Sequence, residues 1–144
     1  MPGQAERDMK HARAVRDIAA ARFDFPTKEF PNLRTATNQP EPTLGIALGP
    51  GEWAYPDIVV TEQPRNVVKM IVEVETADSV TEEEAAKDWK RFSELVETFY
   101  LYVPAGYSDE AKRICKRMKV KVAGIRTWRN IMGMEKVDIT EVYA

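Results

Sequence analysis

Residues 55–76 read YPDIVVTEQPRNVVKMIVEVET, and they contain the clearest structural pattern of the chain. Two runs rich in β-branched residues flank a turn-like segment with a proline, which is the pattern of a β-hairpin. Pairing centred on that turn places Asp57 opposite Val72 or Glu73. Because side chains alternate between the two faces of a strand, Glu73 and Glu75 share one face. The sequence therefore predicts that Asp57, Glu73 and Glu75 converge on one small patch of sheet.

Three carboxylates at such close range repel one another, and a central strand is ordinarily apolar. A compensating cation explains the pattern best. Ligands that offer oxygen and no sulfur suit a hard divalent ion such as Mg²⁺ or Mn²⁺. The alternative is a solvated strand face, in which Glu73 and Glu75 simply point into water.

The residues Pro56-Asp57, the hairpin turn, and Glu73-Val74-Glu75 at the end of an apolar strand resemble the PD-(D/E)xK nuclease superfamily, which has the restriction-endonuclease-like fold. The resemblance implies that the Asp opens the second core strand and that the acidic pair lies on the third. Glu75 stands where the superfamily usually has Lys. A Glu-x-Glu variant of this kind occurs in some active type II restriction enzymes.

The resemblance implies that Asp57 and Glu73 hold Mg²⁺ or Mn²⁺ together with the carbonyl of Val74. Glu75 is then a second ligand or a base for the attacking water. The implied function is a metal-dependent nuclease that hydrolyses phosphodiester bonds of DNA, directed by DNA structure more than by sequence. Two alternatives stay open. One is a catalytically degenerate nuclease fold that binds nucleic acid or a protein, and the other is an interaction domain that meets a basic protein surface.

A length of 144 residues, with 44% hydrophobic and 31% charged residues, predicts one domain over residues 1–144. Cys115 is the single cysteine and His11 the single histidine. These counts exclude an intrachain disulfide, a cysteine-rich zinc site and a His-pair metal site, and they disfavour a His-based triad. Neither a signal-peptide pattern nor an apolar run of membrane-spanning length is present, so we expect a reducing cytoplasmic location without membrane contact.

The remaining pattern predicts an α/β domain with an αβββαβ core, in which helices flank a mixed central sheet. We expect a helix over residues 4–23, an irregular segment over 24–42 and a first core strand over 43–48. After the hairpin we expect a helix that begins near Ser79 or Thr81, a parallel strand over 99–103, a helix from 108, and strands over 120–128 and 137–142. The first helix should bury a stripe made of Ala5, Met9, Ala12, Val15, Ala19 and Phe23.

Several residues could extend the site, and each also has a bland explanation. Glu6 and Asp17 are the acids that the first helix offers, and either is as readily a solvated helix charge. Lys87 or Lys90 could replace the missing lysine of the motif. Trp53 and Tyr55 could stack on a base or could be packing aromatics, and further sequence signals do not separate these readings.

Charge is segregated along the chain. Eight Lys or Arg residues and no acid lie between Lys112 and Arg129, whereas six acids and no base lie between Glu73 and Glu84. An acidic metal patch with a basic surface elsewhere suits a DNA substrate. The alternative is an amphipathic helix with lysine on its wet face, and a homodimer or a protein partner stays open as well.

Overall fold

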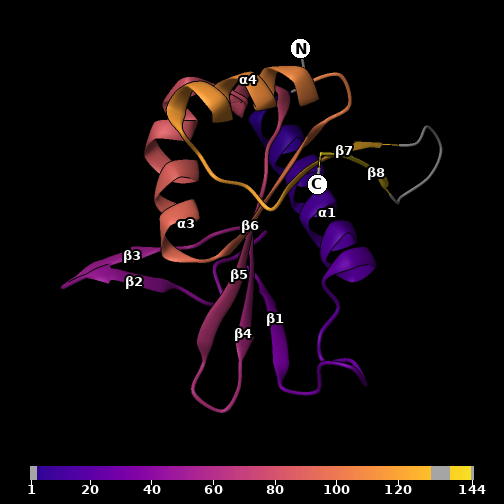
Figure 1. The fold of residues 1–144 in the computed structure, drawn as a ribbon. Helices are drawn as coiled ribbons and strands as arrows, with labels where there is room; N and C mark the ends of the chain where they lie inside the picture. Colours follow the sequence, from indigo (N-terminus) through magenta and orange to yellow (C-terminus); the bar gives the residue numbers. More distant parts are fainter. Residues whose placement is uncertain (1–2, 131–136, 144) are drawn as a thin grey trace.

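A mixed six-stranded sheet forms the centre of the computed structural model, which describes residues 3–130 and 137–143 (Figure 1). Its strands lie in the order β1-β4-β5-β6-β7-β8, and β2 and β3 form a separate hairpin. The strands are β1 (Leu33–Thr37), β2 (Ile46–Gly49), β3 (Glu52–Ala54), β4 (Ile58–Glu62), β5 (Val67–Val74), β6 (Thr98–Pro104), β7 (Gly124–Asn130) and β8 (Val137–Tyr143). The helices are α1 (Gln4–Arg22), the 3-10 turn η1 (Ala77–Ser79), α2 (Glu82–Glu84), the π-helical η2 (Ala85–Trp89), α3 (Lys90–Leu95) and α4 (Ser108–Met118).

The predicted hairpin is confirmed. β4 and β5 pair antiparallel, and Ile58 lies opposite Val72. β5 then pairs parallel with β6, and the helix formed by α2, η2 and α3 makes the crossover that a parallel pair requires. β6 and β7 are also parallel, whereas β7 and β8 are antiparallel. Together with β1 antiparallel to β4, these pairings give a mixed sheet with helices packed against it.

The expected first core strand over residues 43–48 is wrong. The edge strand that pairs with β4 is β1, which lies inside the segment expected to be irregular. Residues 46–49 instead pair with β3 in the separate hairpin, away from the central sheet. The reason is that β1 is an edge strand in which only Leu33 is buried, so it needs little apolar pattern to form. Periodicity alone therefore does not reveal it.

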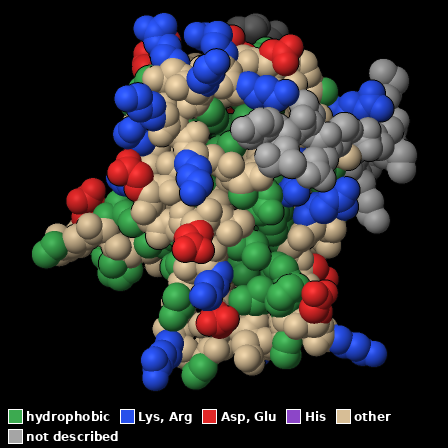
Figure 2. Space-filling view, viewed as in Figure 1, with side chains coloured by type: hydrophobic (Ala, Val, Ile, Leu, Met, Phe, Trp, Pro, Cys, Tyr) green, Lys and Arg blue, Asp and Glu red, His purple; other side chains and the backbone are tan. Residues whose placement is uncertain are grey.

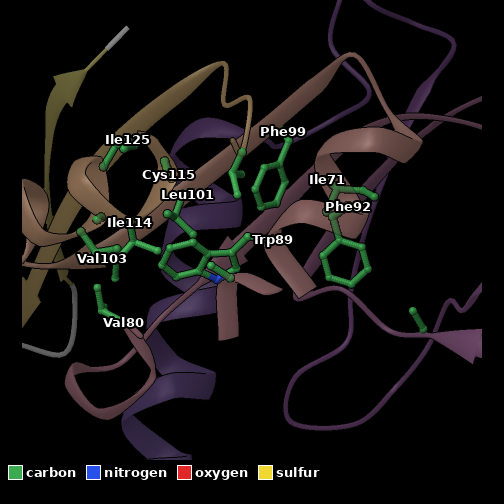
Figure 3. Packing of buried hydrophobic residues seen from close by; sticks show 14 residues of the cluster. Ile71, Val80, Trp89, Phe92, Phe99, Leu101, Val103, Ile114, Cys115 and Ile125 are labelled. Atoms are coloured by element: carbon green, nitrogen blue, oxygen red, sulfur yellow. The ribbon is translucent and has the colours of Figure 1, made fainter. Parts of the chain in front are cut away.

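Two apolar clusters pack on opposite faces of the sheet. α1 covers one cluster through Val15 and Ile18, which pack with Ile58 and Val72. The crossover helix and α4 cover the other, in which the Trp89 ring lies among Leu101, Ile114 and neighbouring residues (Figure 3). None of the helices in the described ranges is both long and apolar enough to cross a membrane.

The buried face of α1 differs from the expected stripe. Ala14, Val15, Ile18 and Ala19 are its buried residues, and Met9 is 63% exposed. The helix packs on the sheet only through its second half. Its first half passes a polar cleft at the end of β5, described below, and therefore has polar neighbours.

Candidate functional site

The β4–β5 register brings Asp57 and Glu73 together. Ile58 lies opposite Val72, so Asp57, which immediately precedes β4, lies opposite Glu73 of β5. The Asp57 N–H donates to Glu73 Oε1 at 3.0 Å, and the Val74 N–H donates to Asp57 Oδ2 at 2.8 Å. Their side chains share one sheet face and are only 5% and 8% exposed. Two buried carboxyl groups thus lie side by side where the two strands end.

The chain leading into β4 is held by a buried amide. Asn38 follows β1, and its Nδ2 donates to the Pro56 carbonyl at 2.6 Å. The Asn38 N–H donates to the Asp57 carbonyl at 3.0 Å. Because these bonds fix the backbone on both sides of the Pro56-Asp57 step, the first strand of the sheet positions the acid of the second.

Glu75 is 4% exposed, and its hydrogen-bond partners are neutral donors. Trp89 Nε1 donates to Glu75 Oε1 at 2.9 Å, and Trp128 Nε1 donates to the Glu75 carbonyl at 3.1 Å. Ser79 also hydrogen-bonds the carboxylate. Trp89 belongs to the π-helical η2, an irregularity that often accompanies functional sites. Glu75 therefore has a fixed orientation that is independent of Asp57.

Burial and repulsion between neighbouring carboxyl groups raise the pKa values of three glutamates around this cluster. Loss of water contact and the charge of Asp57 raise the pKa of Glu73 well above its ordinary value. Burial likewise raises the pKa of Glu75 to about 7, although Ser79 and Trp89 oppose the shift. Burial and a hydrogen bond with Asp88 raise the pKa of Glu84 to about 7. Near neutral pH, these carboxyl groups retain protons that isolated carboxyl groups release.

His11 of α1 reaches into the cluster, and the sequence analysis did not place it there. Its Nε2 lies 2.8 Å from the Val74 carbonyl and 3.3 Å from Asp57 Oδ2. Burial alone lowers the pKa of His11, but the hydrogen bond and charge of Asp57, together with the Val74 carbonyl, raise it overall. The ring N–H thus occupies the point where a carboxylate oxygen and a backbone carbonyl converge. Polar residues on α1 were the one signal that could have indicated this.

These acids line a cleft of about 320 Å³ between α1, the end of β5 and the crossover helix. Further lining residues are Gln4, Arg7, Asp8, Gln39, Tyr55, Thr76, Asp78, Ser79 and Glu84. Glu84 receives its backbone cap from Thr81, as the capping pattern predicts, yet it also faces the cleft. The sequence did not indicate that Glu84 faces the cleft.

Four candidates from the sequence lie elsewhere. Glu6 pairs with Lys10 at 3.6 Å, and Asp17 pairs with Arg16 at 3.2 Å. Lys90 Nζ donates to the Met118 carbonyl at 3.4 Å, and Lys87 is exposed. These residues are absent from the cleft lining, so neither lysine replaces the one missing from the motif. Of the two aromatic candidates, Tyr55 lines the cleft and is 50% exposed.

The donor chemistry of the cleft fits a hard divalent ion, because carboxylate and carbonyl oxygens converge in a buried place. The arrangement is not that of a ready metal site. Within residues 3–130 and 137–143, three or more His, Cys, Asp or Glu side chains are nowhere grouped to hold a metal ion. Two carboxylates and the Val74 carbonyl are the donors available once the His11 ring moves aside.

A scan of protein families, curated proteins and solved structures found no match to this chain.

Proposed function

We propose that this protein is a Mg²⁺-dependent nuclease of the PD-(D/E)xK kind that hydrolyses phosphodiester bonds of DNA. The main support is the burial of Asp57, Glu73 and Glu75 in one cleft, each no more than 8% exposed. Buried, clustered carboxyl groups cost stability when they are charged, and groups with such shifted pKa values are enriched at functional sites. The order of helix, three antiparallel strands, helix and parallel strand in the central sheet agrees with the expected αβββαβ core.

Each residue has a defined role in this proposal. Asp57 and Glu73, with the Val74 carbonyl, would hold the ion, which supplies charge for the phosphate and lowers the pKa of a bound water. His11 has to release Asp57 Oδ2 and the Val74 carbonyl, since its N–H contacts both. Glu75 accepts the proton of the attacking water, and its pKa of about 7 suits a base at neutral pH.

The second candidate is a nuclease fold that has lost catalysis and only binds nucleic acid or a protein, including a second copy of itself. The engagement of Glu75 favours it, because both Trp89 and Trp128 hold this residue by bonds that a purely structural glutamate would also make. For either function we propose the cytoplasmic location that the sequence leads us to expect.

A metal titration followed by a cleavage assay separates the two candidates. Mg²⁺ and Mn²⁺ are titrated while the melting temperature is recorded, and cleavage is measured on single-stranded, duplex and branched DNA. The nuclease should gain a metal-dependent melting shift and cleave at least one substrate, and Glu73→Gln should lose both. Glu83→Gln, on the exposed first turn of the crossover helix, is the matched control and should keep both. An unchanged response in Glu73→Gln would refute the metal site.

A further inference from the structure

Helix α1 carries a Lys or Arg residue at every third position, and each of them lines the cleft or one of the two hollows beside it. These residues are Arg7, Lys10, Arg13 and Arg16. The span from the first to the last is nine residues, about 14 Å of helix. Cations at regular intervals along one rigid element suit a polyanion that follows that element.

The carboxylate cleft continues on both sides along this helix. A hollow of about 770 Å³ lies beside Arg13, Arg16 and Thr37, and it shares Asp8, His11 and Gln39 with the cleft. On the other side, a hollow of about 320 Å³ contains Lys10 and Arg129 and shares Arg7, Thr76 and Asp78 with the cleft. Because neighbouring hollows share lining residues, the three hollows adjoin one another around α1, and we refer to them together as the groove; the acids lie in its middle hollow, and Lys or Arg side chains line the two outer hollows.

Arg13 is a cation of this groove that is available to bind a phosphate. It is partly buried, lines the larger hollow and forms no ion pair with a described residue. Lys10 pairs with the exposed Glu6, and the well-exposed Arg16 pairs with Asp17, which is partly buried on the same helix. Exposed pairs of this type contribute little and exchange readily for a phosphate.

An aromatic side chain lines the middle of the groove. Tyr55 is 50% exposed there, and Trp53, on the β2–β3 hairpin, is 58% exposed. The two rings pack over Gly45, where a Cβ would lie 2.9 Å from the Tyr55 ring and 3.2 Å from the Trp53 ring. Gly45 therefore lets these rings lie against the backbone while an aromatic face stays open. A base can stack on such a face only when it is unpaired.

The basic run between Lys112 and Arg129 offers a different surface. Lys and Arg side chains gather over α4 (Figure 2). Arg113 pairs there with Glu110, and Arg117 Nε lies 2.9 Å from Glu82 Oε1. The hollow beside α4 is lined by lysines and aliphatic residues and shares no residue with the carboxylate cleft. A nucleic-acid strand bound on α4 would thus not pass over the buried carboxylates of the cleft.

We infer that the groove along α1 binds a single strand of nucleic acid, with a phosphate at Arg13 and an unpaired base on Tyr55. This inference rests on the proposed function and specifies its substrate as single-stranded DNA or an unpaired flap. The backbone passes from one basic end of the groove to the other, which brings a phosphodiester over the buried carboxylates.

The test measures binding without catalysis. Fluorescence anisotropy of a labelled single strand and of the matching duplex is recorded in EDTA, over a range of salt concentrations. The single strand should bind more tightly than the duplex. Arg13→Gln should weaken its binding several-fold and reduce the salt slope by about 0.7, the value for one phosphate contact on a single strand. Tyr55→Ala should weaken binding, while Tyr55→Phe should retain it.

Arg113→Gln on α4 is the matched control and should bind like the unaltered protein. The melting temperature of each variant verifies that it folds. Tighter binding of the duplex, unchanged binding by Arg13→Gln, or equally effective displacement by polyglutamate would each overturn the inference. Cleavage by a protein whose binding depends on α4 would leave the proposed function intact and refute only the groove. Binding by the groove with no cleavage would support the groove and refute the nuclease function.

Discussion

The acidic segment (residues 73–84) and the basic segment (residues 112–129) differ in where their charged side chains lie. In the acidic segment, Glu73 and Glu75 are buried, and their pKa values rise. In the basic segment, α4 turns Ala111, Ile114 and Cys115 inward and leaves its cations on the surface (Figure 2). Both segments are equally conspicuous in the sequence. Charge density therefore indicates neither which segment carries chemistry nor which is merely solvated, and burial separates the two.

The difference arises from the elements that carry the charges. β5 is a central strand covered on both faces, so an acid near its end must lie against protein. Backbone N–H groups and the Trp89 indole replace the lost water there. α4 packs by one face only, so its charges remain hydrated at little cost.

Glu73→Gln should produce the largest contrast. If the protein is the proposed nuclease, cleavage should fall on the order of 10³-fold, because several kcal/mol of transition-state stabilisation would depend on the ion. Near neutral pH the metal-free protein should be about as stable, because Gln resembles the protonated carboxyl group and keeps the oxygen that accepts the Asp57 N–H. At a pH high enough to ionise Glu73, the variant should be more stable by about 1 kcal/mol, since one repelling charge is absent. Denaturant melts in EDTA and kinetic assays measure the two effects. Clear destabilisation without metal would mean that a cation already balances Glu73, and the metal site would then be abandoned.

The pH dependence of metal-free stability comes next. Glu75 has a pKa of about 7 in the folded chain against 4.5 ordinarily, so the folded state binds more protons between these values. Its stabilising contribution is complete below pH 4.5 and is lost as the pH rises through about 7, on the order of 3 kcal/mol. The raised pKa of His11 acts in the same direction. Denaturant unfolding at pH 5 and pH 8, compared with Glu75→Gln, checks this. A stability that rises with pH would contradict the shift.

Trp89→Phe should lower the free energy of unfolding by an intermediate amount. It removes the N–H that donates to Glu75 Oε1 at 2.9 Å, in a site that water does not reach readily. A buried acceptor without its partner costs about 1–3 kcal/mol. The loss of a donor to the charged form should also raise the pKa of Glu75 and move the pH transition upward. Trp53→Phe, at a 58% exposed indole, is the control and should change the unfolding free energy by less than about 0.5 kcal/mol.

Arg117→Gln should have the smallest effect. Its ion pair with Glu82 is short, at 2.9 Å, but both side chains are well exposed. Such a pair contributes less than about 1 kcal/mol, and salt weakens it further. Unfolding at low and high salt measures the change. A loss well above that value would show that the basic segment supports the fold as strongly as the acidic one does.

Local pattern was sufficient for much of the fold. The β4–β5 hairpin, the parallel β6 and the amphipathic α4 follow from side-chain period and turn residues, which are properties of neighbours in sequence. The same period placed Glu73 and Glu75 on one face, and the hairpin register placed Asp57 opposite Val72 or Glu73; the structure has Asp57 beside Glu73. β1 escaped because an edge strand needs one partner and little apolar surface, so its pairing with β4 leaves almost no local signal.

Which acids can meet follows from the local sequence, because strand alternation and hairpin register are set within about twenty residues. The tertiary structure decided what surrounds them. His11 is 46 residues from Asp57, Asn38 is 18 from Pro56 and Trp128 is 53 from Glu75, and each contact exists only because helices and strands pack. Packing also places Arg13 beside the cleft and Lys112 away from it. The reason is physical: a period of side chains specifies a face, whereas burial, pKa and the neighbours of a charge depend on what covers that face.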